Sequence, residues 1–453
     1  MSKLSLTEHL AEWLVAWTGK PLRGEMIKVS SDYVLDWLGA AIAGQVTPPG
    51  QILMDYAFAQ GDGTCSIVGS ELTRSAEVAA LVNGGLSHIV EMDDLDRGSV
   101  LHPGAVVIPA ALAVAEREQA SGRDFLAAVI VGYEVAIRIG EAVGKQHYFY
   151  FHNTATCGVF GAAAAAGYLL GLSAEQVVWA LGNAGTQAAG LWEFNRDGAM
   201  SKHLHAGRAA ASGVLAADLA ARGFTGTRFI LEGERGFFAA TAPDAQPERV
   251  IEGLGDGASP LKICGVSIKP HASCRHTHPA IDAALALRPE LDLMAIEQIT
   301  IDSYQAALDL CDNPAPHSPY AAKFSLHYCV ASALYRGRAG LTDFTLDEIQ
   351  TVAVQSLLSR TVATVAPDME ARYPAAWPTR LRIRLKDGTI HETTVDNPKG
   401  DPENPLSQAE LEDKFGDLVA FGGQTARTPA YLAWIRGLAE VSSVRLLSEE
   451  RLI

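Results

Sequence analysis

Residues 152–172 read HNTATCGVFGAAAAAGYLLGL, with an unbroken run of alanines at 162–166. Small side chains let helix axes approach closely, so a helix rich in Ala and Gly on every side suits a position enclosed by other helices. The stretch is uncharged, but its Ala and Gly content is too weakly apolar for a membrane span. We therefore expect a buried helix at residues 158–170 and no membrane partner.

Helical patterns continue on both sides of this stretch, as far as about residue 265. Long Ala-, Leu- and Val-rich segments alternate there with short turns marked by Gly or Pro. The clearest of these segments lie at residues 75–90, 105–120, 123–143, 174–188 and 206–221. The N-terminal segment reads as an amphipathic helix with Ser5 as its candidate cap, and it lacks the features of an export signal.

The pattern changes after Gly265. Residues 295–304 and 379–385 alternate like strands, and Asp387-Gly388 turns the second into residues 389–395 as a hairpin. Predicted helices lie among and after these strands, at residues 279–287, 321–334, 407–415 and 429–437. Residues 397–405, rich in Pro, Gly and Asn, read as a boundary.

These patterns predict a mainly α fold. A large multi-helix domain would be formed by residues 1–266 and 401–453, with a smaller α+β domain inserted at residues 267–400. The composition suits a globular protein, with 48% hydrophobic and 19% charged residues.

The charge of the chain limits its partners. A formal net charge of −16 argues against nucleic acid, which needs a basic surface. An acidic protein that binds an anionic substrate must gather its basic groups in one cleft. The six cysteines are scattered without a C-x-x-C pair, which favours reduced thiols and a cytoplasmic location.

The densest polar cluster runs from His88 to Asp96 (HIVEMDDLD) and is followed by His102-Pro103. Carboxylates at the end of a helix are opposed by the helix dipole, so their presence needs a reason. One interpretation is a solvated acidic loop. A D-D-x-x-D magnesium motif fails because position 97 is Arg. A third interpretation is a carboxylate–imidazole pair that orients a general base.

Two further clusters contain basic side chains. His152 precedes the Ala-rich helix, and taken alone it also fits an ordinary boundary histidine. Lys202, His205 and Arg208 are three residues apart and would share a helical face if a helix begins near Ser201. This basic stripe is a candidate for binding carboxylates, and the alternative is a solvated helix start.

A fourth cluster, residues 268–279 (IKPHASCRHTHP), contains Lys269 and the histidines at 271, 276 and 278. The histidine spacings match no common zinc pattern, and no H-E-x-x-H occurs. The chain also lacks a complete P-loop, a G-x-G-x-x-G after a strand and a G-x-S-x-G elbow. We therefore expect no metal and no cofactor, and acid–base chemistry by side chains.

In this order and spacing the clusters resemble the MmgE/PrpD family, which includes 2-methylcitrate dehydratase, cis-aconitate decarboxylase and iminodisuccinate epimerase. The resemblance covers nearly the whole chain and is strongest at residues 83–109, 152–172, 198–226 and 268–287. It implies a helical domain with an inserted α+β lid related to chorismate mutase, a homodimer, and an active site in the cleft between domain and lid.

The resemblance also implies site residues. The catalytic positions are Asp93, His102, His152, Lys202 and His278. The substrate-binding positions are Glu91, Asp94, Lys269 and Tyr328, to which the basic stripe adds Arg208. The expected substrate is a small anionic carboxylate.

One motif departs from the family pattern. Many dehydratase and decarboxylase relatives read D-F-D-D-T, whereas this chain has Glu91-Met-Asp93-Asp94-Leu95. The longer first carboxylate and the missing Thr hydroxyl weaken the two lyase assignments. The departure favours proton transfer at the α-carbon, as in epimerisation of iminodisuccinate or a similar dicarboxylate. The alternatives are a dehydratase-like or decarboxylase-like lyase and, more remotely, a non-catalytic dicarboxylate-binding module.

Overall fold

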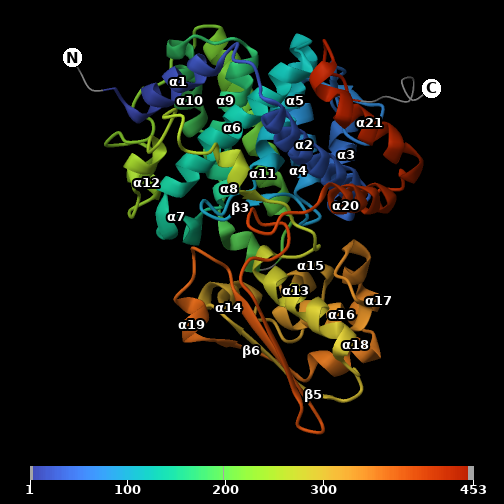
Figure 1. Ribbon diagram of the computed structural model, residues 1–453. Coiled ribbons are helices and arrows are strands. Elements are labelled where there is room, and N and C mark those ends of the chain that lie inside the picture. The colour runs from blue at the N-terminus through green and yellow to red at the C-terminus, as the bar shows by residue number, and fades with distance from the viewer. Residues whose placement is uncertain (1–3, 197, 447–453) are drawn as a thin grey trace. The chain divides into compact units, whose positions relative to one another are not determined.

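The computed structural model describes residues 4–196 and 198–446, and these divide into two compact units. The first unit contains the described residues of Met1–Ile89, Asp93–Val266 and Gln408–Ile453, and the second contains Val90–Met92 and Ser267–Ser407. Most of the chain is helical, which confirms the predicted mainly α fold (Figure 1).

The first unit is built from helices, with short strands β1 (Cys65–Ser66), β2 (Thr73–Arg74) and β3 (Leu95–Asp96), while β4 (Val266–Ser267) lies at the boundary of the units. Its helices are α1 (Leu6–Trp17), α2 (Gly24–Gln45), α3 (Pro48–Phe58), α4 (Ala76–Ser87), α5 (Gly104–Glu118), α6 (Gly122–Ala142), α7 (Gly144–Tyr150), α8 (Asn153–Thr156), α9 (Gly158–Leu169), α10 (Ala174–Gly185), α11 (Ser201–Ala221), α12 (Phe237–Thr241), α20 (Gln408–Phe421) and α21 (Thr428–Gly437).

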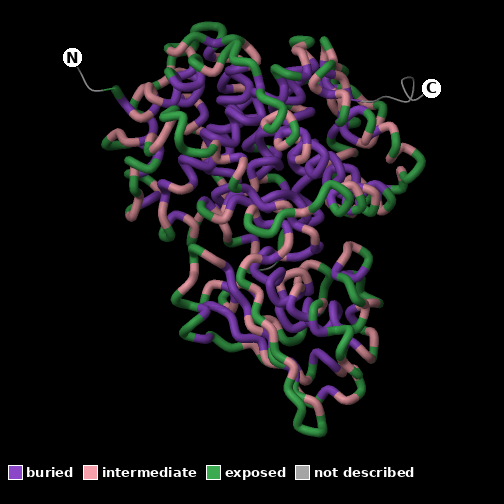
Figure 2. Tube along the Cα trace, in the orientation of Figure 1, coloured by how far each residue is buried: buried purple, intermediate pink, exposed green. Residues whose placement is uncertain are grey.

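Helix α9 is enclosed by its neighbours, as the Ala run predicts. It packs against α5, α6, α10 and α11, and its residues from Gly158 to Tyr168 are all buried. Figure 2 shows the same concentration of buried residues along the inner helices of this unit. Glycine allows α9 to approach α6 closely, because a Cβ at Gly161 on α9 would lie only 2.5 Å from the carbonyl oxygen of Gly132 on α6.

Helix starts follow local capping chemistry. The Ser5 side chain accepts from the backbone N–H of Glu8, and Glu8 accepts from the Ser5 N–H, so the predicted cap of α1 is confirmed as a capping box. Ser75 caps α4 in the simpler way, by accepting from the N–H of Val78. Helix α11 begins at Ser201, where the basic stripe placed its start.

The second unit combines a sheet with helices. Its strands are β5 (Ile296–Ser303), β6 (Thr361–Val365), β7 (Thr379–Leu385) and β8 (Ile390–Val395). Its helices are α13 (His278–Leu287), α14 (Gln305–Cys311), α15 (Pro319–Lys323), α16 (Leu326–Arg336), α17 (Leu346–Ile349), α18 (Val352–Leu358) and α19 (Pro367–Glu370).

The sheet has the order β6-β5-β7-β8. Strands β7 and β8 form the predicted antiparallel hairpin, and Gly388 in its turn adopts a φ of +89° that suits glycine. Leu381 and Ile383 on β7 are buried, while the arginines that alternate with them are not, as the sequence pattern predicts. Helix α13 packs against β7 and β8, so this hairpin has a covered face.

In the second unit one predicted helix was wrong and one strand was missed. The single helix predicted at residues 321–334 is two helices, because Ser325 leaves the helical conformation and accepts from the N–H of Tyr328 to start α16. Strand β6 was not predicted, and it pairs in parallel with β5, which lies about sixty residues earlier. Among the described helices, none is at once long and apolar enough to cross a membrane.

Candidate active site

The segment between α4 and α5 buries all of its carboxylates. Glu91, Asp93, Asp94 and Asp96 have relative exposures of 2%, 1%, 2% and 6%, so the interpretation as a solvated acidic loop is wrong. Buried carboxylates need hydrogen-bonding or charged partners, and each of these has different ones.

Asp93 is the carboxylate of a cluster of imidazoles in the first unit. The His88 Nδ1–H donates to its Oδ2 at 2.6 Å, and Nδ1 of His102 lies 3.2 Å from the same oxygen. The predicted pairing of a carboxylate with His102 is therefore present. The carboxylate favours a proton on the Nδ1 of His102 that faces it, which leaves the Nε2 as the basic atom. The His102 side chain is 13% exposed, whereas that of His88 is fully buried.

Among the described residues, His88, Asp93 and His102 form the one group whose metal-binding atoms all lie within 4.8 Å of one another. Two ligands of one tetrahedral zinc lie about 3.4 Å apart, because each bond is about 2.1 Å long. The 2.6 Å between His88 and Asp93 is shorter and is that of a charge-assisted hydrogen bond. The spacing is therefore that of a hydrogen-bonded cluster rather than that of ligands around one metal ion.

His152 and His205 form a second imidazole pair beside this cluster. Their Nδ1 atoms are 3.3 Å apart, so one ring donates an N–H hydrogen bond to the other. The His152 ring stacks on that of His88, with centroids 5.4 Å apart. Burial, followed by the positive charges of His88 and Lys202, lowers the pKa of His152 well below its usual value. Burial and the same charges lower the pKa of His205 to about 4. Both rings are neutral near neutral pH.

Lys202 and His205 project from the first turns of α11 toward this group, and Lys202 is buried. Arg208 is exposed. A helix turns about 100° per residue, so positions six apart point in directions about 120° apart. The basic stripe is thus split, and a substrate contact by Arg208 stays a prediction.

Hydrogen bonds hold the loop that carries His102. Asp96 Oδ2 accepts from the backbone N–H and the hydroxyl of Ser99, both at 2.7 Å. The Asn153 side-chain amide donates to the Ser99 carbonyl at 2.7 Å, and the His102 N–H donates to the Thr154 hydroxyl at 3.2 Å. Burial raises the pKa of Asp96 to about 6. Asn153 and Thr154, at the start of α8, therefore fix the position of the loop that carries His102.

Both carboxylate oxygens of Asp94 accept hydrogen bonds from the protein. Its Oδ1 accepts from the N–H of Gly104 at 3.0 Å and its Oδ2 from the hydroxyl of Tyr133 at 2.6 Å, which fixes the start of α5. Burial raises the pKa of this carboxyl well above its usual value. Its predicted contact with substrate stays a prediction.

Glu91 and Lys269 form an ion pair within the second unit. Nζ of Lys269 lies 3.7 Å from the Glu91 carboxylate, and both side chains are buried. Glu91 has a φ of +60°, which is strained for a residue other than glycine. Burial, and then the Glu91 charge, raise the pKa of Tyr320. Tyr320 was not predicted as a site residue.

The predicted tyrosine, Tyr328, makes contacts within the second unit, and its predicted contact with substrate stays a prediction. Its buried hydroxyl donates to the carbonyl of Asp343, and its ring packs at 5.6 Å from that of Phe344. These contacts join α16 to the loop before α17.

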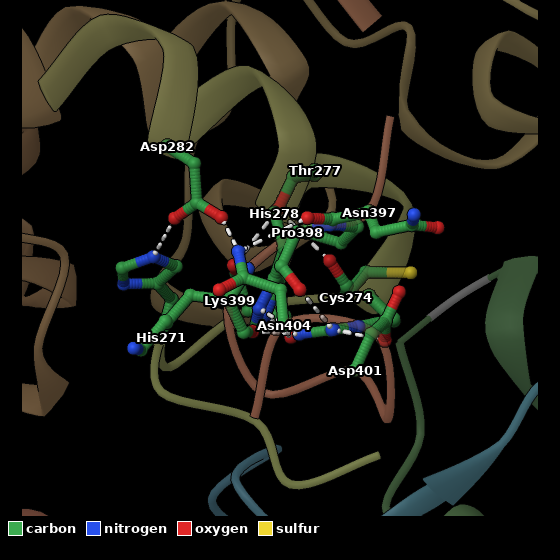
Figure 3. Close-up of polar contacts among 12 residues, drawn as sticks. His271, Cys274, Thr277, His278, Asp282, Asn397, Pro398, Lys399, Asp401 and Asn404 are labelled. Carbon is green, nitrogen blue, oxygen red and sulfur yellow. Dashed lines mark hydrogen bonds and ion pairs between the residues drawn. The ribbon is translucent and has the colours of Figure 1, made fainter. Parts of the chain in front are cut away.

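His278 lies in a polar network at the start of α13 (Figure 3). Its Nδ1 accepts from Arg275 at 2.9 Å, and its Nε2–H donates to the Ser273 carbonyl at 3.2 Å. Arg275 is also paired with Asp401. Burial, and then the charge of Arg275, lower the pKa of His278 well below its usual value. With both ring nitrogens engaged, its predicted role in proton transfer stays a prediction.

Asp282 organises the other side of this network. It accepts from Nε2 of His271 at 2.8 Å and from the N–H of Lys399 at 2.6 Å, as Figure 3 shows. The residues of this network belong to the second unit, whereas those of the imidazole cluster belong to the first.

The lowered pKa of His205 leads to a prediction about stability. A histidine whose pKa falls from 6.5 to about 4 on folding binds fewer protons folded than unfolded between these values. Its contribution to stability is therefore present above about pH 6.5 and is lost as the pH falls toward 4. We expect the free energy of unfolding to fall more between about pH 7 and pH 5 in the wild type than in His205→Asn, by about 1 kcal/mol after allowance for partial exposure.

Urea titrations at the two pH values measure this difference. Titrations at about pH 8, where an imidazole is neutral in both states, give the baseline of the variant. Equal losses of stability in the two proteins would contradict the prediction.

Comparison with known proteins covers most of the chain. The model of the MmgE/PrpD N-terminal domain matches residues 8–250, and that of the C-terminal domain matches residues 271–430. A cis-aconitate decarboxylase-like protein of Aspergillus oryzae is 27% identical over 448 residues, covering 92% of this chain and 91% of the relative. The cis-aconitate decarboxylase of Aspergillus terreus is 26% identical, covering 99% and 96%, and that of Homo sapiens is 29% identical, covering 91% and 87%.

Proposed function

Because this chain belongs to the MmgE/PrpD family, we propose that it is an enzyme that moves a proton on the carbon next to a carboxylate of a small di- or tricarboxylate. The observation that carries this proposal is the pair formed by Asp93 and His102, 3.2 Å apart, in which only the imidazole is partly exposed. A carboxylate behind an accessible imidazole is an arrangement for a general base.

In the proposed reaction the Nε2 of His102 removes the α-proton, and Asp93 stabilises the imidazolium that forms. The negative charge that develops on the substrate carboxylate is stabilised by the ammonium group of Lys202, which is buried and therefore little screened by water. Lys269 and Arg208 are the proposed partners of the remaining carboxylates.

The proton returns from a second acid, for which His152, Lys202 and His278 are the candidates. The Nδ1 atoms of His152 and His205 are 3.3 Å apart, so a hydrogen bond between them orients the His152 ring. That the residues of the two units serve one active site, and that residues 267–400 act as a lid, stay predictions, as do the homodimer, the cytoplasmic location and the absence of a metal and of a nucleic-acid partner.

The first candidate reaction is epimerisation of iminodisuccinate or a similar imino dicarboxylate. Here the proton leaves one face of the carbon and returns to the other, with no other bond broken. Its support is the altered acidic motif, in which the buried Leu95 stands where many lyase relatives have Thr and offers no hydroxyl.

The second candidate is decarboxylation of cis-aconitate, in which a carbon–carbon bond breaks, CO2 leaves and a proton takes its place. Its support is the names of the relatives, two cis-aconitate decarboxylases and a cis-aconitate decarboxylase-like protein at 26–29% identity over nearly the whole chain.

One experiment distinguishes the candidates. The protein is incubated in D2O with iminodisuccinate, 2-methylcitrate or cis-aconitate, and the products are followed by NMR. We expect deuterium at the α-carbon of the accepted substrate. Epimerisation retains the carbon skeleton, decarboxylation releases CO2, and dehydration releases water.

Dialysis against EDTA before the assay is expected to leave the rate unchanged, since the proposed steps use only side chains. Loss of the activity on dialysis, with recovery on adding a divalent cation, would contradict that part of the proposal. Binding of a dicarboxylate without any isotope exchange would overturn the catalytic proposal and favour a binding module.

A further inference from the structure

His88 is the least accessible member of the imidazole cluster. It is the C-cap of α4, and its side chain is fully buried. Its Nδ1 is already engaged by the Asp93 carboxylate at 2.6 Å, so that atom is not available to a substrate. Any effect of His88 on the reaction is therefore expected to be exerted through a neighbouring residue.

That neighbour is Asp93. The same oxygen, Oδ2, takes the hydrogen bond of His88 at 2.6 Å and lies 3.2 Å from Nδ1 of His102. The His88 bond is the shorter of the two, so it restrains the carboxylate oxygen that also faces His102. A short bond to an ionised acceptor is roughly twice as strong as one between neutral groups, and it also fixes direction.

The remaining surroundings of His88 keep its ring in place. Its plane is at 68° to that of His102, with centroids 4.8 Å apart, and at 16° to that of His152. The ring is thus held from two sides, and its Nδ1 is aimed at Asp93. The charged and titratable groups around His88 are Asp93, His102, His152 and, at the start of α11, Lys202 and His205. The charge of His88 contributes to lowering the pKa of both His152 and His205.

We propose that His88 is a positioning residue of the reaction, which holds the Asp93 carboxylate against His102 so that the imidazolium is stabilised as it forms. This inference rests on the proposed function for its catalytic consequence, but the geometry that it invokes exists without substrate. It predicts that the important atom of His88 is Nδ1 with its hydrogen.

A matched pair of substitutions isolates that atom. In His88→Asn the side-chain NH2 lies where Nδ1 lies in histidine, whereas in His88→Gln it reaches about as far as Nε2. Both are neutral amides of similar polarity. His88→Leu retains apolar volume and removes the donor altogether.

We expect His88→Gln and His88→Leu to lower kcat by about 10- to 100-fold with little change in KM, the usual effect of losing a partner that orients a functional group. His88→Asn is expected to recover most of this loss. The acidic limb of the pH profile of kcat/KM should move to lower pH in the Gln and Leu variants, because the imidazolium of His102 loses its carboxylate.

A second measurement needs no activity. The Cε1–H signal of His102, labelled with 13C at histidine and assigned by its absence in His102→Gln, is titrated in each variant. We expect its titration to move to lower pH in His88→Gln and His88→Leu and to return toward the wild-type position in His88→Asn. His147→Phe removes another buried imidazole with hydrogen bonds, to Thr241 and Thr156, and should leave the His102 titration unchanged.

The two measurements separate the two proposals. If no substrate is turned over but the His102 titration follows the predicted order, the proposed function fails and the positioning role stands. If the enzyme is active and the titration is the same in all variants, the positioning role is wrong. A movement to higher pH on losing His88 would show that His88 acts only as a competing positive charge, and this would also overturn the inference.

Discussion

His102→Ala is expected to lower kcat/KM by a factor of about 10² to 10⁴, the contribution of a positioned general base. The reason is that Asp93 retains its place but has no imidazole to support, so no group of suitable basicity faces the substrate. Lys202→Ala should cause a loss of similar size, because the charge that develops on the substrate then lacks its ammonium partner. Steady-state kinetics with the accepted substrate measure both losses.

The fold of these variants needs to be intact for this comparison. His102 is partly exposed and its backbone N–H, which donates to Thr154, is retained in the variant. We therefore expect circular dichroism and the melting temperature to stay close to those of the wild type. His391→Ala, a histidine of β8 paired with Glu290, serves as the matched control and should retain full activity. Near-normal turnover in both His102→Ala and Lys202→Ala would contradict the assignment of the site.

Gly207→Ala is expected to destabilise the helical unit strongly. A Cβ at Gly207 on α11 would lie 2.1 Å from the carbonyl oxygen of Leu81 on α4, and backbone atoms cannot move aside alone. The two helices must separate, which we expect to cost about 3 kcal/mol. Because α4 ends at His88 and α11 carries Lys202, part of the activity should be lost as well.

The control is the same substitution where space is open. Gly416 lies inside α20, and a Cβ there would meet no heavy atom within 4 Å. Gly416→Ala should therefore stabilise the protein by about 0.5–1 kcal/mol, since glycine in a helix interior is unfavourable. Thermal unfolding of the two variants against the wild type measures the opposite signs. A melting temperature for Gly207→Ala equal to that of the wild type would show that the helix contact is looser than the structure indicates.

The helices could be predicted because their cause is local. An apolar run between a capping Ser and a Gly reads the same in any context, which is why α1 was predicted with its cap at Ser5. The hairpin of β7 and β8 is equally local. Strand β6 was missed because its partner β5 is distant in the sequence, and the break at Ser325 was missed because apolar residues continue on both sides of it.

The site was predictable in part. The pairing of a carboxylate with His102 follows from the short segment that contains both, and the structure confirms it. His88 was quoted in that segment, but its bond to Asp93 depends on how the chain turns after α4. His205 was noted in the basic stripe, yet its partner His152 comes from the short connection between α7 and α8. Arg208 does not share a helical face with Lys202, because residues spaced by three move progressively around the helix, and its side chain is exposed.

The enclosure of α9 has a further consequence for experiments on this protein. Backbone amides that are both helical and surrounded by other helices exchange their hydrogens with solvent only when the enclosing structure opens as a whole. Deuterium uptake of a peptide from Gly158–Leu169, measured by mass spectrometry, therefore reports the opening of the helical unit in any variant, whether or not that variant turns over a substrate.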